Sequence, residues 1–334
     1  MKIIHDFSEV TMENKCIPIL YEGEGSIIQP ADLNAFRELN RKKNKKLESK
    51  LMTEEEAVDR FVKSGDYIGF ELYGTVRSPM NMVRALIRSG KTDFRLAGQG
   101  VHEADLLLGA NLIREIDFTY IGLEVFGVSG NVRRRVESGD VHNVVEWSNA
   151  ALTWRFKAAA MGIPFMATKC MLGSDTLKRS AAKVIECPFT GEKLALVPAL
   201  ILDVGFIHVN RADKYGNCQI DGISGFAFEM GRACKKLIIS AEEIIETDEI
   251  REAPDRTIIP YYLVDAVVHA PYASWPGEMS NSHEKDVDHY NFYLSKQKTQ
   301  EGMDEYLKEW VYDVPNHQAL LKKIGHDKLE SLKL

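Results

Sequence analysis

The sequence lacks any long apolar run. Its longest uninterrupted apolar stretch is the nine residues from Leu194 to Leu202, which include Pro198, whereas a membrane-spanning helix needs roughly twenty apolar residues. The sequence therefore predicts no membrane span. The chain also opens without an apolar signal region, because Met1–Ile4 runs at once into His5 and Asp6. This opening favours a cytoplasmic location.

Cysteine is scarce, and positive charge is not in excess. The five cysteines, at positions 16, 170, 187, 218 and 234, form no Cys-x-x-Cys pair, which argues against a disulfide framework or a zinc knuckle. We expect them to be buried free thiols. The 42 Lys+Arg against 49 Asp+Glu leave a formal net charge of −7. That charge offers no global attraction to nucleic acid or to an anionic membrane, and neither is expected as a partner.

Several common site motifs are missing. No phosphate-binding loop occurs, and Gly98–Gly100 lacks the third glycine of a dinucleotide site. The serine of Gly222–Gly225 is misplaced for a nucleophile elbow. His283 and His289 lie six apart in a polar segment, which is more typical of a solvated surface than of a metal site, so we expect no metal. His208 stands among apolar strand residues and is predicted to be a hydrogen-bonded core histidine.

What is present is the composition of an ordinary globular protein, 45% apolar and 27% charged, with a change of character near residue 50. Residues 1–50 are predicted to be an N-terminal extension with a basic helical stretch, either a solvated helix face or an arm that docks a partner or an anionic ligand. Residues 51–334 are predicted to form one α/β domain. In that domain, strand-like and helix-like segments alternate, which implies an open, mainly parallel, doubly wound sheet with helices on both faces.

The expected elements follow from capping residues and apolar periodicity. Helices are expected at 53–63, 79–88, 146–161, 299–312 and 315–324. Strands are expected at 67–73, 94–97, 118–126, 163–168, 237–240 and 262–269, with two more inside 194–209.

An ordered set of short motifs runs from about Leu51 to Leu334. The set comprises Ser64-Gly65-Asp66, Arg77-x-Pro79, Pro164-Phe165, Val197-Pro198-Ala199, Asp203 with Ile207-His208, Ala212-Asp213, Gly216-Asn217, Glu242–Ile245 with Glu249–Arg251, Val264–Val268 with Ala270–Tyr272, and Lys308–Val311. Through them the chain resembles the α (A) subunit of family I CoA-transferases, which have a CoA-transferase/NagB-like fold, and in particular the glutaconate CoA-transferase type. Residues 1–50 lie outside the resemblance.

The resemblance implies a heteromeric enzyme, αβ, α2β2 or larger, that moves CoA between an acyl-CoA and a carboxylic acid. In this family a glutamate of the β chain attacks the thioester, passes through an acyl-glutamyl anhydride to a glutamyl-CoA thioester, and then hands CoA to a second carboxylate. Its Ser-Glu-Asn-Gly type motif is absent here, so the nucleophile is expected on a partner chain, the β subunit. Coenzyme A enters as a substrate, and no cofactor or metal is implied.

The α half of the family usually gives a Gly-Gly-Phe loop whose amides approach the thioester oxygen. The matching positions here read Glu71-Leu72-Tyr73, followed by Gly74. Because a carboxylate beside a developing oxyanion would oppose it, Glu71 must turn away or the chemistry must differ. In the first interpretation Glu71 lies on the face opposite Leu72, or at the open end of the strand, paired with Arg77 or Arg95.

In the second interpretation Glu71 is a general base that activates water. Some CoA-transferase-like pairs in steroid ring degradation are hydrolases, so the resemblance admits this chemistry. Glu146 is a second candidate, because it is expected to share a helix face with Asn149. Capping and helix-dipole complementarity are the competing explanation for the segment Glu146–Asn149, which includes Ser148.

Further candidates bind rather than react. Leu72, Tyr73, Gly74, Arg77, Ser148 and Asn149 are the expected substrate and CoA contacts. The run Arg133–Arg135 is either a solvated basic loop or a contact for CoA phosphates. Tyr73, Trp147 and Trp154 either line an acyl pocket for a cyclic substrate or belong to the core.

Three functions therefore stand side by side. The first is the α subunit of a CoA-transferase. The second is a CoA-thioester hydrolase, ring-cleaving or thioester-cleaving, in which Glu71 or Glu146 directs water. The third is a subunit that binds acyl-CoA without turnover.

Overall fold

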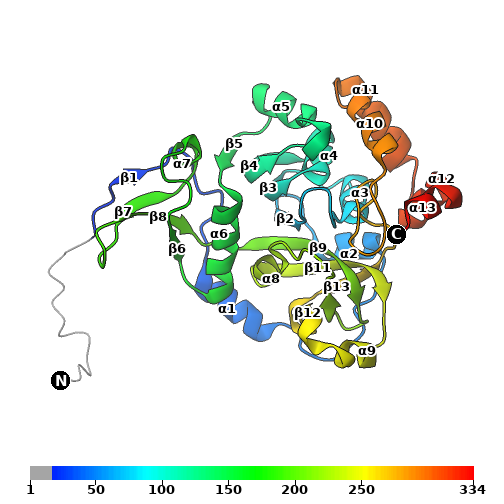
Figure 1. Cartoon of the computed structure of the whole chain (residues 1–334), viewed down its shortest axis with the longest axis horizontal. Coiled ribbons are helices and arrows are strands. Elements are labelled where there is room, and N and C mark those ends of the chain that lie inside the picture. Colours follow the sequence, from blue (N-terminus) through cyan, green and yellow to red (C-terminus); the bar gives the residue numbers. More distant parts are fainter. Residues whose placement is uncertain (1–16) are drawn as a thin grey trace.

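The computed structural model describes residues 17–334, and residues 1–16, including Cys16, lie outside the described part. A nine-stranded sheet forms the centre of this part (Figure 1). Parallel strands lie side by side in the order β13 (Ala266–His269), β11 (Cys234–Ile244), β9 (Leu202–Ala212), β2 (Tyr67–Glu71), β3 (Phe94–Gly100), β4 (Ile113–Ile121) and β5 (Asn143–Glu146). The short strands β10 (Cys218–Gln219) and β12 (Thr257–Ile259) complete the sheet in antiparallel pairing.

Helices cover both faces of this sheet. On one face the core is built with α2 (Glu54–Phe61), α3 (Met80–Arg88), α4 (His102–Gly109), α5 (Gly130–Glu137), α10 (Val287–Lys296) and α11 (Gln300–Leu307). On the other it is built with α1 (Leu33–Lys42), α6 (Asn149–Met161) and α8 (Ala227–Gly231). The helices α9 (Thr247–Glu252), α12 (His317–Ile324) and α13 (His326–Leu332) complete the C-terminal half.

The alternation of side chains along the central strands explains the two cores. Ile68 and Phe70 of β2 pack beneath α2–α4, whereas Tyr67 packs beneath α6. In β9, Phe206 faces the first core and Ile207 the second. Strands apolar on both sides are typical of a parallel sheet covered by helices. Because the strands run parallel, their carboxyl ends lie together at one open side of the sheet.

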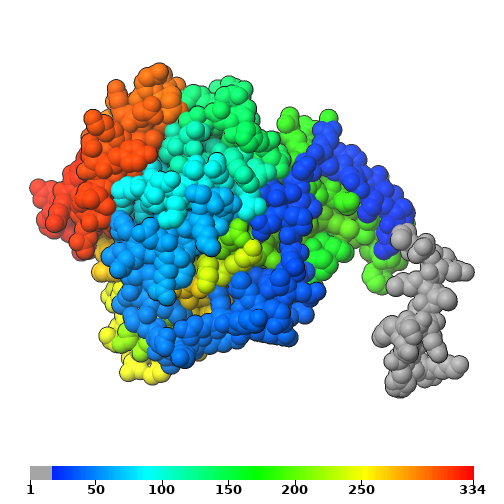
Figure 2. All heavy atoms as spheres, turned by 180° about the vertical axis from the view of Figure 1, so that it is seen from behind, coloured from blue at the N-terminus to red at the C-terminus, as the bar shows by residue number. Residues whose placement is uncertain are grey.

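A second, antiparallel sheet projects from the main body (Figure 1). Its strand order is β1 (Tyr21–Glu22), β7 (Lys183–Glu186), β8 (Lys193–Pro198) and β6 (Phe165–Thr168), with α7 (Asp175–Arg179) beside it. Figure 2 shows the N-terminal segment running from this sheet across the surface of the body. Part of that segment packs firmly, since Phe36 of α1 is buried in the core with α6.

Most of the expected elements are confirmed. The parallel, doubly wound sheet is present, and α2 begins at the predicted cap, Thr53, in a complete capping box with Glu56. The two strand runs inside 194–209 are β8 and β9. His208 is fully buried, with Nδ1 2.9 Å from Ser240 Oγ and Nε2 2.8 Å from Glu242 Oε1, as expected of a core histidine.

Several expectations were wrong. Strand β4 begins at Ile113, five residues before the expected start, and β6 belongs to the projecting sheet. Helix α6 begins at Asn149, not at Glu146. His283 and His289 are buried rather than solvated, because Tyr272 stacks on the first and Tyr306 bonds the second. Of the four cysteines in the described range, only Cys218 and Cys234 are buried.

No helix in the described range is both long and apolar enough to cross a membrane.

Asp117 of β4 is a buried hub on the α6 face of the sheet. Its carboxylate accepts hydrogen bonds from the Tyr67 hydroxyl, from Trp147 Nε1 at 2.5 Å and from Arg155 Nη1 at 2.7 Å. The Arg155 guanidinium also lies over the Trp147 ring, 4.1 Å from its centroid, and donates to the carbonyl of Pro198. The Asp117 carboxylate thus joins β2, β4 and α6, and Arg155 extends the connection to β8.

Glu103 is a buried acid of another kind. It lies in the first turn of α4 and is almost fully buried. Burial raises the pKa of Glu103 to about 8, against hydrogen bonds from the amides of Val101, Glu103 and Ala104 that lower it. At neutral pH the side chain is therefore mainly a neutral carboxylic acid, held by the Val101 amide at 3.1 Å.

Replacing Asp117 with alanine should cost about 3–5 kcal/mol of unfolding free energy, because the Arg155 charge would remain buried without its partner. The matched control is Asp248→Ala. Asp248 pairs with Arg251 at 2.7 Å on the exposed surface of α9, and loss of such a pair costs under about 1 kcal/mol. Urea unfolding of the two variants measures both values, and equal losses would contradict the role given to Asp117.

Glu103→Gln should change the pH dependence of stability. The folded-state pKa is raised, so between pH 4.5 and 8 the folded state holds a proton that the unfolded state has lost, and stability falls as pH rises through this window. A glutamine keeps the bond to Val101 and cannot ionise. Between pH 5 and pH 8, the melting temperature of the variant should rise relative to that of the wild type. Melting temperatures that change with pH in parallel for the two proteins would contradict the raised pKa of Glu103.

Candidate active site at the carboxyl ends of the strands

The candidate site lies where β2, β3, β4 and β5 end side by side. Tyr73 follows β2, Gln99 is the last but one residue of β3, Thr119 lies near the end of β4, and Asn149 opens α6 after β5. Carboxyl ends of parallel strands form the usual ligand-binding edge of an open α/β sheet. The fold thus gathers four polar or aromatic side chains that are far apart in the sequence.

Glu71, the last residue of β2, forms a buried ion pair with Arg77. Arg77 Nη1 and Nη2 lie 2.8 and 2.9 Å from the two carboxylate oxygens, and both side chains are fully buried. The Phe226 amide also donates to Glu71 Oε1 at 3.2 Å. Of the two cations that the sequence suggested, Arg77 is the partner, and Arg95 pairs with Asp203 instead. Both oxygens of Glu71 are therefore occupied.

Arg77 ties this pair to two further segments. Its Nε donates to the carbonyl of Ile223 at 3.0 Å and its Nη1 to that of His208 at 3.2 Å. Gly225 makes the approach possible, because a Cβ there would lie 2.2 Å from Glu71 Oε1. The pair thus holds the end of β2, the middle of β9 and the segment 223–226 in one arrangement.

Residues 73–76 form a tight turn above the ion pair. The amides of Tyr73 and Val76 each donate to the other's carbonyl. Gly74 has φ of 59°, a conformation that favours glycine. Within residues 17–334 the Gly74 amide donates to no protein acceptor. Tyr73 is half exposed, whereas Leu72 is buried in the core on the opposite side from Glu71.

An uncharged cavity of about 260 Å³ lies beside this turn. We call it the aromatic cavity; it is lined by Tyr73, Gln99, Thr119, Asn149, Ala150, Leu152, Thr153, Trp154, Gly225 and Phe226. Among the described residues, no charged side chain lines it. Two of the three aromatic candidates from the sequence, Tyr73 and Trp154, are in its wall, while Trp147 belongs to the Asp117 hub.

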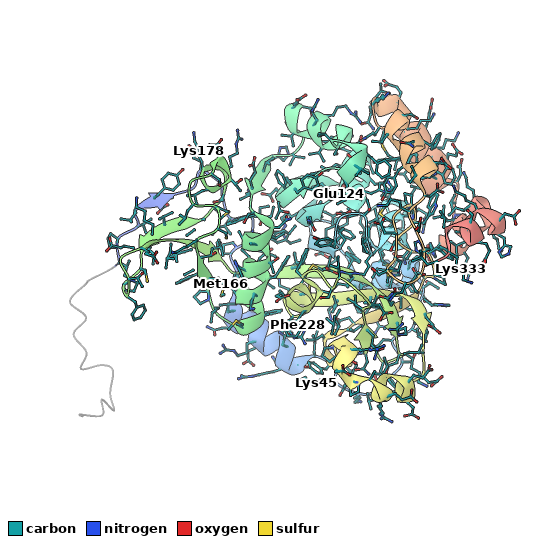
Figure 3. The ribbon with its side chains drawn as sticks, viewed as in Figure 1. Lys45, Glu124, Met166, Lys178, Phe228 and Lys333 are labelled. Carbon is teal, nitrogen blue, oxygen red and sulfur yellow. The ribbon has the colours of Figure 1, made fainter. Side chains whose placement is uncertain are left out.

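A second cavity of about 610 Å³ adjoins the first, because Tyr73, Gln99 and Asn149 line both. We call it the charged cavity; its other lining residues are Gly74, Thr75, Val76, Tyr120, Glu124, Val125, Glu278 and Lys285. Lys285 Nζ donates to Glu278 Oε1 at 2.9 Å and to Thr75 Oγ1 at 3.4 Å. Glu124, labelled in Figure 3, is a second carboxylate on this lining.

Other predicted residues lie apart from the two cavities. Glu146 is the last residue of β5, so the expectation that it shares a helix face with Asn149 was wrong. Its carboxylate lies 3.7 Å from Arg179 Nε. Ser148 caps α6, accepting from the Ala151 amide at 3.1 Å. The run Arg133–Arg135 is part of α5 and not a loop. Two of its arginines join α5 to the C-terminal helices through Gln297 and Gln300.

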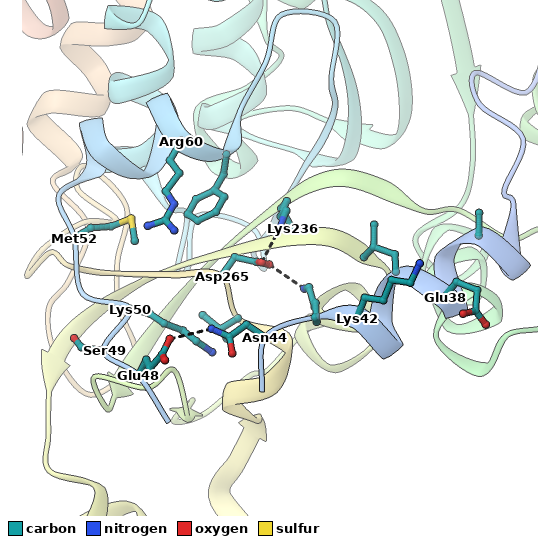
Figure 4. A pocket seen from close by; sticks show the side chains of 15 residues that line it. Glu38, Lys42, Asn44, Glu48, Ser49, Lys50, Met52, Arg60, Lys236 and Asp265 are labelled. Carbon is teal, nitrogen blue, oxygen red and sulfur yellow. Dashed lines mark hydrogen bonds and ion pairs between the residues drawn. The ribbon is translucent and has the colours of Figure 1, made fainter. Parts of the chain in front are cut away.

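A third groove, of about 710 Å³, lies at the amino ends of the strands, opposite the candidate site (Figure 4). Lys236 near the start of β11 and Asp265 just before β13 belong to its lining, with Lys42, Lys50 and Arg60. Asp265 binds Lys43 and Lys236 at 2.9 and 3.1 Å. The N-terminal segment thus closes over the amino ends of the strands, away from the candidate site.

The sequence missed several residues of the site, namely Gln99, Thr119, Phe226 and Lys285. Gln99 lies inside the glycine-rich run 98–100, whose sequence pattern points only to a nucleotide motif. Phe226 and Lys285 lie in segments without periodicity, and only the folded chain brings them beside β2.

Comparisons with known proteins identify the family. The coenzyme A transferase family model matches residues 51–270. The A subunit of glutaconate CoA-transferase from Acidaminococcus fermentans is 32% identical over 305 residues, 86% of this chain and 95% of that protein. The A subunit of 3-oxoadipate CoA-transferase from Pseudomonas knackmussii is 32% identical over 284 residues, 84% of this chain and 100% of that protein.

The fold agrees as well, and a hydrolase relative is more distant. The crystal structure of glutaconate coenzyme A-transferase from Acidaminococcus fermentans matches with a TM-score of 0.82 at 31% identity, covering 86% of this chain and 96% of that one. The cholesterol ring-cleaving hydrolase IpdA subunit of Rhodococcus jostii is 26% identical over 277 residues, 80% of this chain and 94% of that protein. The chain belongs to the coenzyme A transferase family.

Proposed function

We propose that this chain is the α subunit of a cytoplasmic, heteromeric CoA-transferase, and that a β subunit brings the nucleophilic glutamate to the edge formed by Tyr73, Gln99 and Asn149. The observation that carries the proposal is the turn 73–76 at the carboxyl end of β2, where Tyr73 is half exposed and Gly74 is partly exposed. Its Gly74 amide is free to donate to the thioester oxygen as negative charge develops there. One such donor is worth about 3–4 kcal/mol of transition-state stabilisation.

The Glu71–Arg77 pair supports this chemistry rather than opposing it. The Glu71 carboxylate is directed to the Arg77 guanidinium, which binds both of its oxygens and neutralises its charge. It therefore places no unbalanced charge beside the developing oxyanion. The same pair argues against Glu71 as a base that activates water, because both oxygens already accept hydrogen bonds.

Trapping the covalent intermediate tests the proposal. The complex, purified through this chain, is incubated with acyl-CoA and reduced with borohydride, which converts a glutamyl-CoA thioester to an alcohol at that residue. Peptide mass spectrometry should locate the reduced glutamate on the partner chain. A reduced glutamate on this chain, or acyl-CoA consumption with no adduct on either chain, would overturn the assignment. Binding of acyl-CoA without any consumption would instead identify a subunit that has lost turnover.

Glu71→Gln separates the two roles of Glu71. If the pair is structural, the variant should lose about 3–5 kcal/mol of unfolding free energy, since Arg77 stays buried and charged. Where the complex remains folded, its kcat/KM should stay within roughly tenfold of the wild type. Removing a general base would instead cost about 10²–10⁴-fold.

The matched control is the double variant Glu71→Gln, Arg77→Met. It removes both charges, so its unfolding free energy should exceed that of the single variant, as measured by urea unfolding. A double variant less stable than the single one would contradict the structural role.

A further inference from the structure

The two cavities of the candidate site differ in what they offer an acyl group. The aromatic cavity is lined by the aromatic and apolar side chains of Tyr73, Trp154, Phe226 and Leu152, and its polar lining is neutral. An apolar ring buried there gains both hydrophobic contact and favourable ring–ring geometry. A carboxylate placed there would lose its hydration with no cation in return, which is strongly unfavourable.

The charged cavity does not offer a cation either. Among residues 17–334, Lys285 is the one ammonium on its lining and is already paired with Glu278 at 2.9 Å, and Glu124 adds a second carboxylate to the same lining. Two carboxylates against one ammonium leave a net negative lining. A second carboxylate on the substrate would therefore be disfavoured in both cavities of the candidate site, by lost hydration in the aromatic cavity and by repulsion in the charged one.

The aromatic wall is held in place from several sides. Trp154 lies on α6, whose start is fixed by the Ser148 cap. Phe226 stacks on Phe156 of the same helix at a centroid distance of 5.7 Å. The Phe226 amide donates to Glu71, so the ion pair below also positions this ring.

We propose that the acyl group handled at this site carries an apolar ring, aromatic or alicyclic, and no second carboxylate. The ring lies in the aromatic cavity against Trp154 and Phe226, and the thioester lies at the junction formed by Tyr73, Gln99 and Asn149. Trp154 is the specificity-determining residue. The inference rests on the proposed function and names the substrate class of that same site.

The test compares phenylacetyl-CoA and cyclohexylacetyl-CoA with glutaryl-CoA as CoA donors for the assembled complex, with acetate as acceptor. The ring substrates should have a kcat/KM at least about tenfold above that of glutaryl-CoA. Trp154→Ala should lower the value for ring substrates by about tenfold, mainly through KM, and should leave the value for butyryl-CoA, a donor without a ring, nearly unchanged. A preference for glutaryl-CoA, or an equal loss for all donors, would overturn the inference.

Two further variants keep the result interpretable. Phe228→Ala removes a half-exposed ring of α8 that does not line the cavity (Figure 3), and it should leave the ratio of ring to glutaryl activity unchanged. Thr119→Arg places a cation in the aromatic cavity and should shift that ratio toward glutaryl-CoA. An unshifted ratio in a folded Thr119→Arg complex would contradict the proposed position of the acyl group.

Failure of the proposed function has a different signature. If no donor supports CoA transfer, the transferase assignment fails, and the inference is then decided by equilibrium binding of the same acyl-CoAs to the complex. Weaker binding of phenylacetyl-CoA to Trp154→Ala, with glutaryl-CoA binding unaffected, would support it. Equal binding of both acyl-CoAs to wild type and variant would overturn it.

Discussion

The ion pair between Glu71 and Arg77 is the interaction on which the arrangement of the site depends. It is fully buried at the end of the central strand β2, and it joins that strand to β9 and to residues 223–226. Two buried charges are costly unless their hydrogen bonds are satisfied, and here the guanidinium and the carboxylate each have backbone partners as well. The turn that carries Tyr73 and Gly74 lies between the two residues of this pair. The pair also positions the ring of Phe226, because the Phe226 amide donates to Glu71.

A second buried carboxylate, Asp117 of β4, performs a similar task two strands away from β2. Through Tyr67, Trp147 and Arg155 it binds the sheet to α6, and α6 carries Asn149 and Trp154 to the same edge of the sheet. The site is thus supported by two polar centres on one face, each surrounded by apolar packing. Such an arrangement keeps the side chains of the edge in place while the edge itself remains open to a substrate and a partner chain.

The sequence predicted the fold more fully than the site. Apolar alternation and capping residues are local signals, so α2 with its Thr53 cap and the strands around Phe206 could be recognised directly. The same alternation put Glu71 on the face opposite Leu72, where it lies. The start of β4 and the helix α10 with its buried His289 were missed, because polar residues there are satisfied by distant partners such as Tyr306. Glu146 was wrongly expected in a helix, because its pairing with Phe118 of β4 places it in strand β5 although helix α6 begins only three residues later.

By itself, the sequence determined the class of fold, the order of its elements and the family resemblance, because these depend on residue periodicity and on motifs within a few positions of one another. It also singled out Glu71 as the residue at which the family's glycine pair is missing. Only the tertiary structure decided that Arg77 neutralises Glu71, that Gln99, Thr119 and Phe226 join Trp154 in one uncharged cavity, and that Lys285 is already paired. Those outcomes depend on contacts between segments far apart in the sequence, and such contacts exist only once the parallel strands have brought their ends together.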